Sequence, residues 1–368
     1  MSRAVLVGPT PASRPRRAPR GLLSLALLSL GAFACGGPGP ATTPQKVSAE
    51  TEDVEPPEPE VATARLESFD LTPAKVEVVV RDPGQAPRRE LRYTASDGEA
   101  SSFGIASATR SVLILGAKAA PAAVMPETRM SGRVTLADTE DPNLRVVHLA
   151  TGGVTVAERP GVPAGFVEAA QARFAAFEGF SLRLDMQPHG QIGAAKLEMK
   201  VGADPEIDAS VRGLAESILR AAVVLPTEPV GLGAEWSATQ SFDQMGTKVT
   251  ETVTYTLTAL EAEGATFDVE VTQTAPPGPF AAPGLPDGST AVLESLETSG
   301  RGELTLRWTQ PFPVESSASL HSRFAARIEA GEQQQALALE IDAEMRLGEP
   351  GVALPPPPED STSVDAAG

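Results

Sequence analysis

Three histidines are the first residues whose type could support chemistry, because a neutral imidazole can bind zinc or act as a general base. His148, His189 and His321 lie far apart in the chain, and two of them fall in predicted strands. No His-Glu-x-x-His, Cys-x-x-Cys or paired-His spacing accompanies them. We therefore predict no metal site and no cofactor, and we interpret the imidazoles as solvated or hydrogen-bonded. The sequence leaves open whether the three histidines come together in the folded protein.

An acidic triplet, Asp204, Glu206 and Asp208, has the spacing that opens a calcium-binding loop. Such a loop would need Gly and Glu where this chain has Ala209 and Ala215. Negative charge at the start of a helix explains the triplet better, because it complements the positive end of the helix dipole.

Nucleophilic catalysis has no recognisable motif here. The chain lacks G-x-S-x-G, G-x-x-x-x-G-K-[ST] and G-x-G-x-x-G. Carboxylates are plentiful on the polar faces of predicted strands, and sequence does not determine which of them meet. We expect a protein that is not an enzyme, and a hydrolase with an unrecognised site remains an alternative. Trp236 and Trp308 are predicted to pack in the core.

The single cysteine follows an apolar run, residues 21–34, that is itself preceded by four Arg between residues 14 and 20. The run is shorter than the about 20 residues that span a bilayer, which favours an export signal over residues 1–34. Ala34-Cys35-Gly36 resembles the bacterial lipoprotein signal, which implies an acylated Cys35 as the new first residue. The match departs at Ala32 and Phe33. An ordinary secretory signal with a free Cys is the alternative.

Charge and anchoring together indicate a location. The chain has 30 basic and 48 acidic residues. Five of the basic residues and none of the acidic ones lie before residue 36, so the rest of the chain has 25 basic and 48 acidic residues. This balance argues against nucleic acid or an anionic lipid surface as a partner. Several acyl chains on Cys35 would hold the protein to a membrane. Gly36, in place of an Asp, favours the outer membrane of a Gram-negative envelope, with the periplasmic or the outer side left open.

Two polar segments are predicted to flank the folded part. Residues 35–63 are rich in Pro and Glu, and the stretch 36–60 has Val47 and Val54 as its sizeable apolar side chains. It therefore cannot bury enough surface to offset the entropy of ordering. We expect a disordered tether there and a second, Pro-rich tail over residues 349–368. A partner that binds proline-rich segments could dock on either one.

The single domain over residues 64–348 is predicted to be mainly β with some helix. Apolar and polar residues alternate through 249–259, 267–272, 303–308 and 337–347. Weaker strands fit eight further segments, residues 89–95, 110–115, 128–137, 144–149, 181–186, 194–201, 235–242 and 315–328. Breaks are expected at Gly264, Gly300 and Gly331. A long antiparallel meander that curls into a half-barrel or barrel is the expected architecture.

Two amphipathic helices interrupt the predicted sheet. Residues 164–178 place Val167, Ala170, Phe174 and Phe177 on one stripe. Residues 205–224 place Ile207, Val211, Leu214, Ile218 and Leu225 on another, with Asp204 as N-cap, Pro205 as first residue and Pro226 as stop. Both helices are expected to pack on the sheet. Residues 187–190 are predicted to form a hairpin turn between them.

A proline-rich loop over residues 275–290 is long enough to be functional. Phe280 and Leu285 could cover a cavity or contact a partner there, and a loose connection between strands is the simpler interpretation.

The segment from Leu225 to Trp236, LPTEPVGLGAEW, resembles the LP…PV-x-x-G-x-x-W stretch of a bacterial lipoprotein domain family of unknown function. The Thr-rich strand around Val253 and Tyr255 follows at the place that the resemblance requires. The likeness covers roughly residues 88–347. It implies an envelope location and a β-rich fold with Val230-Gly231 as a turn, and it implies no activity.

The sequence therefore predicts a lipid-anchored envelope protein that binds an apolar ligand or an envelope component without catalysis. A curled sheet with helices against it could enclose an apolar cavity. The architecture would then be similar to half-barrel carriers of lipids or lipoproteins, which is an analogy of fold alone. A structural or protein-interaction scaffold of the envelope, with an envelope protein as partner, is the second hypothesis.

Overall fold

The alternation predicted for residues 249–259 belongs to one strand of a large antiparallel sheet. The computed structural model describes residues 65–95, 99–202, 205–244, 246–281, 289–331 and 333–356. Within these ranges the protein is mainly β, with a sheet of sixteen strands and two α-helices. The signal segment, Cys35, the predicted tether, Asp204, Leu285 and the end of the predicted tail lie outside the described residues.

The first half of the sheet comes from the strands before α2. Their bounds are β1 Arg65–Leu71, β2 Glu77–Asp82, β3 Ser101–Leu115, β4 Lys118–Ala119, β5 Ala123–Val124, β6 Glu127–Asp138, β7 Arg145–Ala157, β8 Ser181–Met186 and β9 Ile192–Val201. The second half has the bounds β10 Glu235–Gln244, β11 Thr247–Leu260, β12 Gly264–Ala275, β13 Gly278–Pro279, β14 Ser289–Arg307, β15 Glu315–Ala330 and β16 Gln333–Gly348. The helical elements are α1 Phe166–Phe174, a short 3₁₀ turn Ala175–Phe177, and α2 Pro205–Arg220.

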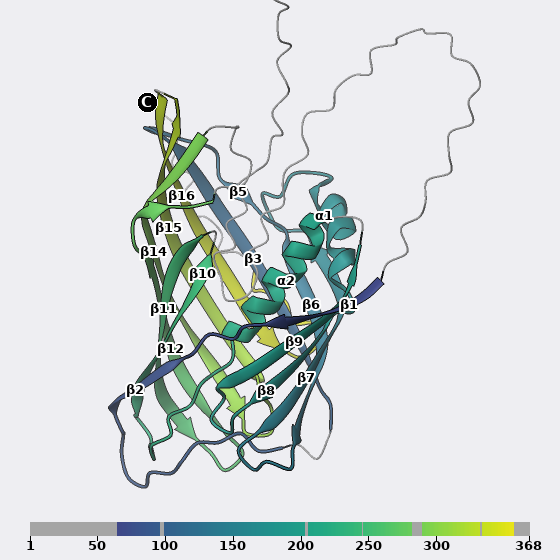
Figure 1. Ribbon diagram of the computed structural model, residues 1–368, viewed down its shortest axis with the longest axis vertical. Coiled ribbons are helices and arrows are strands. Elements are labelled where there is room, and N and C mark those ends of the chain that lie inside the picture. Colours follow the sequence, from purple (N-terminus) through teal and green to yellow (C-terminus); the bar gives the residue numbers. More distant parts are fainter. Residues whose placement is uncertain are drawn as a thin grey trace, which may run out of the picture.

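Two meanders share this sheet. The main strand order is β1-β9-β8-β7-β6-β3-β16-β15-β14-β12-β11-β10-β2, so β16 joins the later meander to β3 of the earlier one. The sheet curls around an interior (Figure 1). Its two end strands, β1 and β2, do not pair with each other, so hydrogen bonds do not close the sheet into a barrel.

Two connections cross the open side of the curled sheet. Residues 72–76 run directly from β1 at one end of the sheet to β2 at the other, and α2 makes the same crossing between β9 and β10. We call residues 72–76 the strap. Gln191 holds the strap, because its Oε1 accepts a hydrogen bond from Val76 N at 3.1 Å and its Nε2 donates to Ala74 O at 3.3 Å.

Both predicted helices are confirmed in position and in their buried face. Ala170, Phe174 and Phe177 are buried, and Gln171 of α1 bonds the backbone of β7 at both Val154 and Val156. On α2 the predicted stripe is buried, with Val211, Leu214 and Ile218 inside. The helix ends at Arg220 rather than at 224. Val223 and Val224 are β-branched and favour extended backbone, and their carbonyls accept bonds from Tyr93 Oη and Trp236 Nε1.

The predicted hairpin turn is also confirmed. Gln187 N donates to Gln191 O at 2.8 Å, and Gly190 N donates to Gln187 O at 2.8 Å. Gly190 has a φ of +97°, and a Cβ there would lie 2.3 Å from Val223 O. Only glycine fits this turn, because both the backbone angle and the close approach exclude a side chain.

The strand predicted over residues 89–95 is wrong. Leu91 and Tyr93 are buried as the alternation indicates, but Tyr93 N donates to Pro188 O and Thr94 N donates to Trp308 O, each at 2.7 Å. The segment therefore bonds to the loops at one end of the sheet instead of joining a ladder. Period-two burial does not distinguish these two situations, since both present alternate side chains to the core.

The break predicted at Gly300 is wrong as well, whereas β12 does begin at Gly264 and Gly331 does follow β15. Strand β14 continues through Gly300 and Gly302. A Cβ on Gly302 would lie 2.2 Å from Ser317 O. Glycine inside a strand can mark a close approach of neighbouring backbone rather than an end.

Residues 349–356 follow β16 and lie against the domain. Leu354 is buried, and its backbone N donates to Glu127 Oε1 at 3.1 Å. Arg159 contacts both Glu344 and Pro355 O in the same region. The folded domain therefore extends into the segment predicted as a tail from residue 349, and it includes at least Leu354.

Candidate functional site: an interior cavity with a polar row

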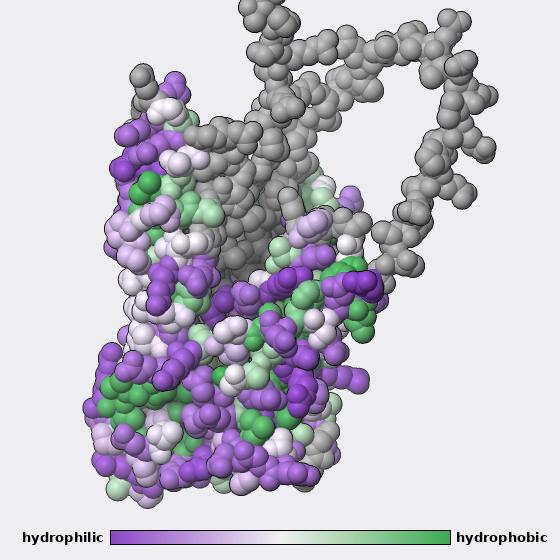
Figure 2. Space-filling view, in the orientation of Figure 1, coloured by the Kyte–Doolittle hydropathy of each residue, from purple (hydrophilic) through white to green (hydrophobic). Residues whose placement is uncertain are grey.

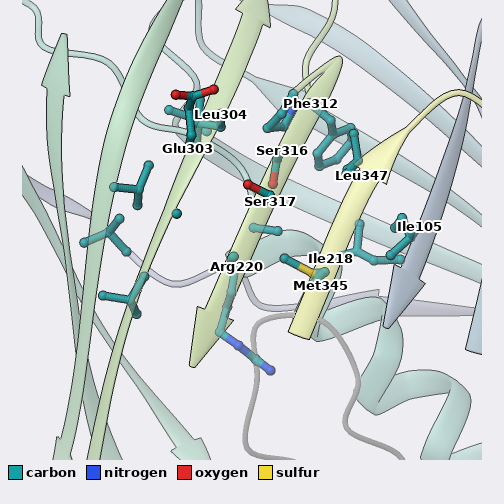
Figure 3. Close-up of a pocket in the computed structure, with 18 of the residues that line it drawn as sticks. Ile105, Ile218, Arg220, Glu303, Leu304, Phe312, Ser316, Ser317, Met345 and Leu347 are labelled. Carbon is teal, nitrogen blue, oxygen red and sulfur yellow. The ribbon is translucent and has the colours of Figure 1, made fainter. Parts of the chain in front are cut away.

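An apolar cavity of about 130 Å³ lies between the inner face of the sheet and the end of α2 (Figure 3). Its walls come from β3, β6, β7, β11, β12, β14, β15 and β16, from the segment after β14 that contains Phe312, and from residues at and after the end of the helix (Ile218, Arg220, Ala221 and Val223). The volume is close to that of an engineered cavity of about 150 Å³ that binds benzene. It is below the about 300–1,000 Å³ of pockets for drug-sized ligands.

Small residues lie where β14 and β15 form part of the cavity wall. The register pairs Gly302 with Val269 on one side and Ala318 on the other, and it pairs Gly300 with Val271 and Leu320. Leu304 and Leu306 are buried two and four residues beyond Gly302, so Gly300 and Gly302 share their inward side. Gly302 and Ala318 line the cavity, and the lack of a side chain at Gly302 admits the backbone of β15, because a Cβ there would lie 2.2 Å from Ser317 O.

A row of polar side chains crosses the inner face next to the cavity. The strand pairing aligns Gln240, Glu251, Gln273, Thr298 and Ser322 across β10, β11, β12, β14 and β15. All five are buried. We call this alignment the polar row. Apolar residues lie on both sides of it, with Val253 and Val271 on the cavity side and Val249 and Phe324 on the other.

Glu251 is the charged member of the polar row, and only 2% of its surface is exposed. Gln240 Nε2 donates to its Oε1 at 2.7 Å, and Gln273 Nε2 donates to its Oε2 at 2.5 Å. Thr298 and Ser322 bond each other at 2.8 Å. Buried polar groups are costly unless they are paired, and these bonds satisfy both carboxylate oxygens.

Arg220, the last residue of α2, is a half-buried charged residue on the cavity wall, which also includes the exposed Arg301 and Glu303. Its Nη2 donates to Ser217 Oγ at 2.9 Å, and its Cζ lies 4.4 Å from the centroid of the Phe242 ring. Desolvation lowers the pKa of the guanidinium, and the negative charges of Glu251 and Glu216 oppose that shift. Figure 3 shows the guanidinium pointing away from the labelled apolar residues Leu304, Phe312 and Leu347.

An aromatic cluster forms part of the core beside the cavity. Trp236 stacks on Tyr255 with ring centroids 5.4 Å apart, and Phe267 meets Trp236 edge-on at 5.4 Å. Desolvation by burial raises the pKa of both Tyr93 and Tyr255, and the charge of Glu251 adds to the effect on Tyr255. The prediction that Trp236 and Trp308 pack in the core is confirmed, since both are buried.

The residues singled out for metal or acid–base chemistry do not come together. His148 is exposed on β7, His321 Nδ1 lies 2.8 Å from Asp342 Oδ1, and His189 is in the turn after β8. Asp208 Oδ1 accepts a bond from Gly202 N at 3.3 Å near the start of α2. Within the described ranges, no three His, Cys, Asp or Glu side chains group closely enough to hold a metal ion.

Phe280 of the proline-rich loop packs edge-on against Phe324, with ring centroids 5.3 Å apart. Its backbone N donates to Ala291 O at 3.1 Å, beside the short pairing of β13 with β14. This side chain thus joins the apolar cluster beyond the polar row rather than facing solvent as a docking group.

The segment that carries the family resemblance forms part of the core. Leu225, Val230 and Trp236 are buried, and Val230 pairs with Arg89 through an isolated bridge. Gly231 N donates to Pro83 O at 2.9 Å, which supports the predicted turn before β10.

Sequence comparison finds no matching protein family and no matching curated protein. The resemblance therefore stays a prediction. Among the described helices, none has the length and apolar character needed to cross a membrane.

Sequence reasoning missed Arg220, Glu251 and the polar row as a group. Glu251 occupies an inward position in the alternation of residues 249–259, where every other large side chain is apolar. A charged residue at a core position was the available signal, because buried charges need partners and often mark function.

Proposed function

We propose that the protein is a lipid-anchored envelope protein whose curled sheet binds a small apolar ligand without catalysis. The observation that carries this proposal is the apolar cavity of about 130 Å³ on the inner face. Acylated Cys35 would anchor the protein to a membrane, with the outer membrane favoured by Gly36. In this proposal the strap and α2 complete the half-barrel across the side that hydrogen bonds leave open.

The cavity volume narrows the class of ligand. A pocket smaller than those of drug-sized ligands fits one ring or one short hydrocarbon chain better than a diacyl lipid. The analogy with carriers of whole lipids or lipoproteins therefore gains no support from the size. Glu251, a carboxylate of the cavity wall, has both oxygens bonded by glutamines, which favours a binding role over acid–base catalysis.

Filling the cavity tests this function. Ala318 faces the cavity, whereas the next residue, Ser319, is exposed. Binding of 1-octanol, measured by calorimetry, should weaken by about tenfold or more in Ala318→Leu, because the larger side chain occupies the ligand volume. The matched Ser319→Leu variant places the same side chain on the exposed face of the sheet, so it should bind 1-octanol as the parent does.

Native mass spectrometry of the purified protein gives an independent measurement. A small apolar molecule that co-purifies with the parent and is lost from Ala318→Leu supports the proposal. Equal 1-octanol affinity in parent and Ala318→Leu, with both folded by circular dichroism, would contradict it.

A scaffold role is the second candidate, and one observation favours it. A hollow of about 750 Å³ lies over the outward side of β12, β14, β15 and β16 and reaches Leu354 and Pro355. Both Arg301 and Glu303 line it. Crosslinking in cells from a photoreactive residue at Ser319 would capture an envelope protein if this hollow is a docking surface.

A further inference from the structure

Arg220 gives the cavity a charged end. Its side chain lines the cavity, and its guanidinium points away from the apolar part in Figure 3. Arg301 also lines the cavity, but it is exposed on the outward side of β14, whereas Arg220 is half-buried at the inner end. Largely apolar walls with a half-buried cation at one end match an amphiphile, which has a hydrocarbon tail and a polar head. This reasoning rests on the proposed function and adds the chemistry of the head group.

The guanidinium retains hydrogen-bonding capacity for a ligand. An arginine side chain has five N–H donors, and the described part of the chain shows one of them bonded, to Ser217 Oγ. No carboxylate oxygen of a described residue forms an ion pair with Arg220 within 4.0 Å. Glu251 lines the same cavity, but its oxygens accept from Gln240 and Gln273.

Because Gln240 and Gln273 occupy the oxygens of Glu251, the described structure has no hydrogen bond between that carboxylate and the guanidinium of Arg220. Gln240 makes this arrangement explicit, because its Nε2 bonds Glu251 Oε1 and also lies 3.4 Å from the backbone oxygen of Arg220. Stacking on Phe242 and the bond from Ser217 hold the guanidinium in place. A fixed guanidinium whose remaining donors bond no described residue suits a planar or tetrahedral anion, which it can bind through two parallel bonds.

We infer that the cavity takes the tail of a single-chain amphiphile whose anionic head, a carboxylate or a phosphate, pairs with Arg220. Both heads present oxygens to the guanidinium, and the short apolar volume limits the tail to one chain.

The test compares ligands that share a tail and differ in the head. Calorimetry with octanoate, octyl phosphate, 1-octanol and inorganic phosphate is carried out on the full chain. The parent should bind octanoate or octyl phosphate about tenfold or more tighter than 1-octanol, because a charge-assisted pair is worth more than a neutral contact. Inorganic phosphate alone should not bind measurably, since it lacks the tail. Binding of inorganic phosphate as tight as that of octyl phosphate would indicate a free anion site and overturn the inference.

Arg220→Gln should reduce the ratio of octanoate to 1-octanol affinity to near one. Arg220→Lys keeps the charge but loses the bidentate geometry, so its affinity ratio should lie between those of the parent and Arg220→Gln. Arg212→Gln is the matched control, because Arg212 also lies on α2 and stacks on an aromatic ring, Phe69, with its Cζ 3.8 Å from the centroid. Arg212 does not line the cavity, so its loss should leave the ratio unchanged.

The outcomes separate the two proposals. If neither octanoate nor octyl phosphate binds the parent more tightly than 1-octanol does, or if Arg220→Gln and Arg220→Lys both fold and keep the parent ratio, the head-group inference is wrong and the apolar-ligand function stands. If no tail-bearing ligand binds the parent, both proposals are wrong.

Discussion

Trp236 shows at the scale of one residue how a side chain ties three segments together. It is fully buried, its Nε1 donates to Val224 O at 3.3 Å after α2, and its ring packs between Tyr255 of β11 and Phe267 of β12. Replacement by phenylalanine would leave both a cavity and an unpaired buried carbonyl. We expect Trp236→Phe to lower the free energy of unfolding by about 2–4 kcal/mol, measured by urea denaturation.

Trp308→Phe is the natural comparison. Trp308 is 8% exposed and lies next to Arg89, whose Cζ is 5.9 Å from the ring centroid. Its position at the end of the sheet allows solvent to compensate for lost contacts, so the destabilisation should be smaller than for Trp236→Phe. Equal losses in the two variants would show that the bond to Val224 adds nothing to the packing of Trp236.

At the scale of elements, one glutamine bonds the backbone of the strap at two points. Gln191 bonds the backbone at Val76 and Ala74 and so fixes residues 72–76 beside the turn after β8, while the Val76 side chain packs against the core. Gln191→Ala should increase hydrogen exchange at Val76 and lower the free energy of unfolding by about 1–2 kcal/mol. Gln171→Ala is the matched control, because Gln171 makes the same pair of bonds to β7. It should raise exchange at Val156 and leave Val76 as protected as before. Unchanged exchange at Val76 in Gln191→Ala would contradict this role of Gln191.

The elements also show what sequence can and cannot predict. Strand β11 was predictable because Val253, Tyr255 and Leu257 alternate without exception, and α2 because its apolar stripe starts at a proline and a capping signal. The strands β1 and β2 were not predicted, since residues 65–82 are short, partly exposed edges whose place depends on distant partners. β14 was misjudged at Gly300, because only the neighbouring strand reveals that glycine serves close packing there.

The candidate site needed the tertiary structure for the same reason. The polar row is an alignment of five strands by register, and no local spacing connects Gln240, Glu251 and Ser322. Arg220 reaches the row only because α2 crosses from one end of the sheet to the other. Sequence could show that Glu251 occupies a core position, but not which residues would satisfy its charge.

At the scale of the whole molecule, the surface combines an acidic balance with scattered apolar residues. Figure 2 shows hydrophilic and hydrophobic residues interspersed on one face, with hydrophobic residues gathered at the lower left, where Figure 1 places β2. Val79 of β2 is half exposed. The net charge of −18 makes electrostatic attraction to an anionic bilayer unfavourable. The membrane attachment proposed above therefore rests on the acyl anchor at Cys35 rather than on charge.

The anchor is the prediction that concerns the molecule as a whole. Cys35 precedes β1 by 30 residues, a segment that reaches at most about 100 Å when extended. β1 leads directly into the strap, so a tether attached to the bilayer would enter the domain at its open side.

In a Gram-negative host, the parent protein should incorporate a radiolabelled acyl precursor and sediment with membranes. Cys35→Ser should do neither, because no other residue of the chain offers a thiol. Ser24→Ala, within the predicted signal, is the control and should be acylated as the parent is. Equal labelling of the parent and Cys35→Ser would exclude the anchor, whereas the proposal for the interior cavity does not depend on it.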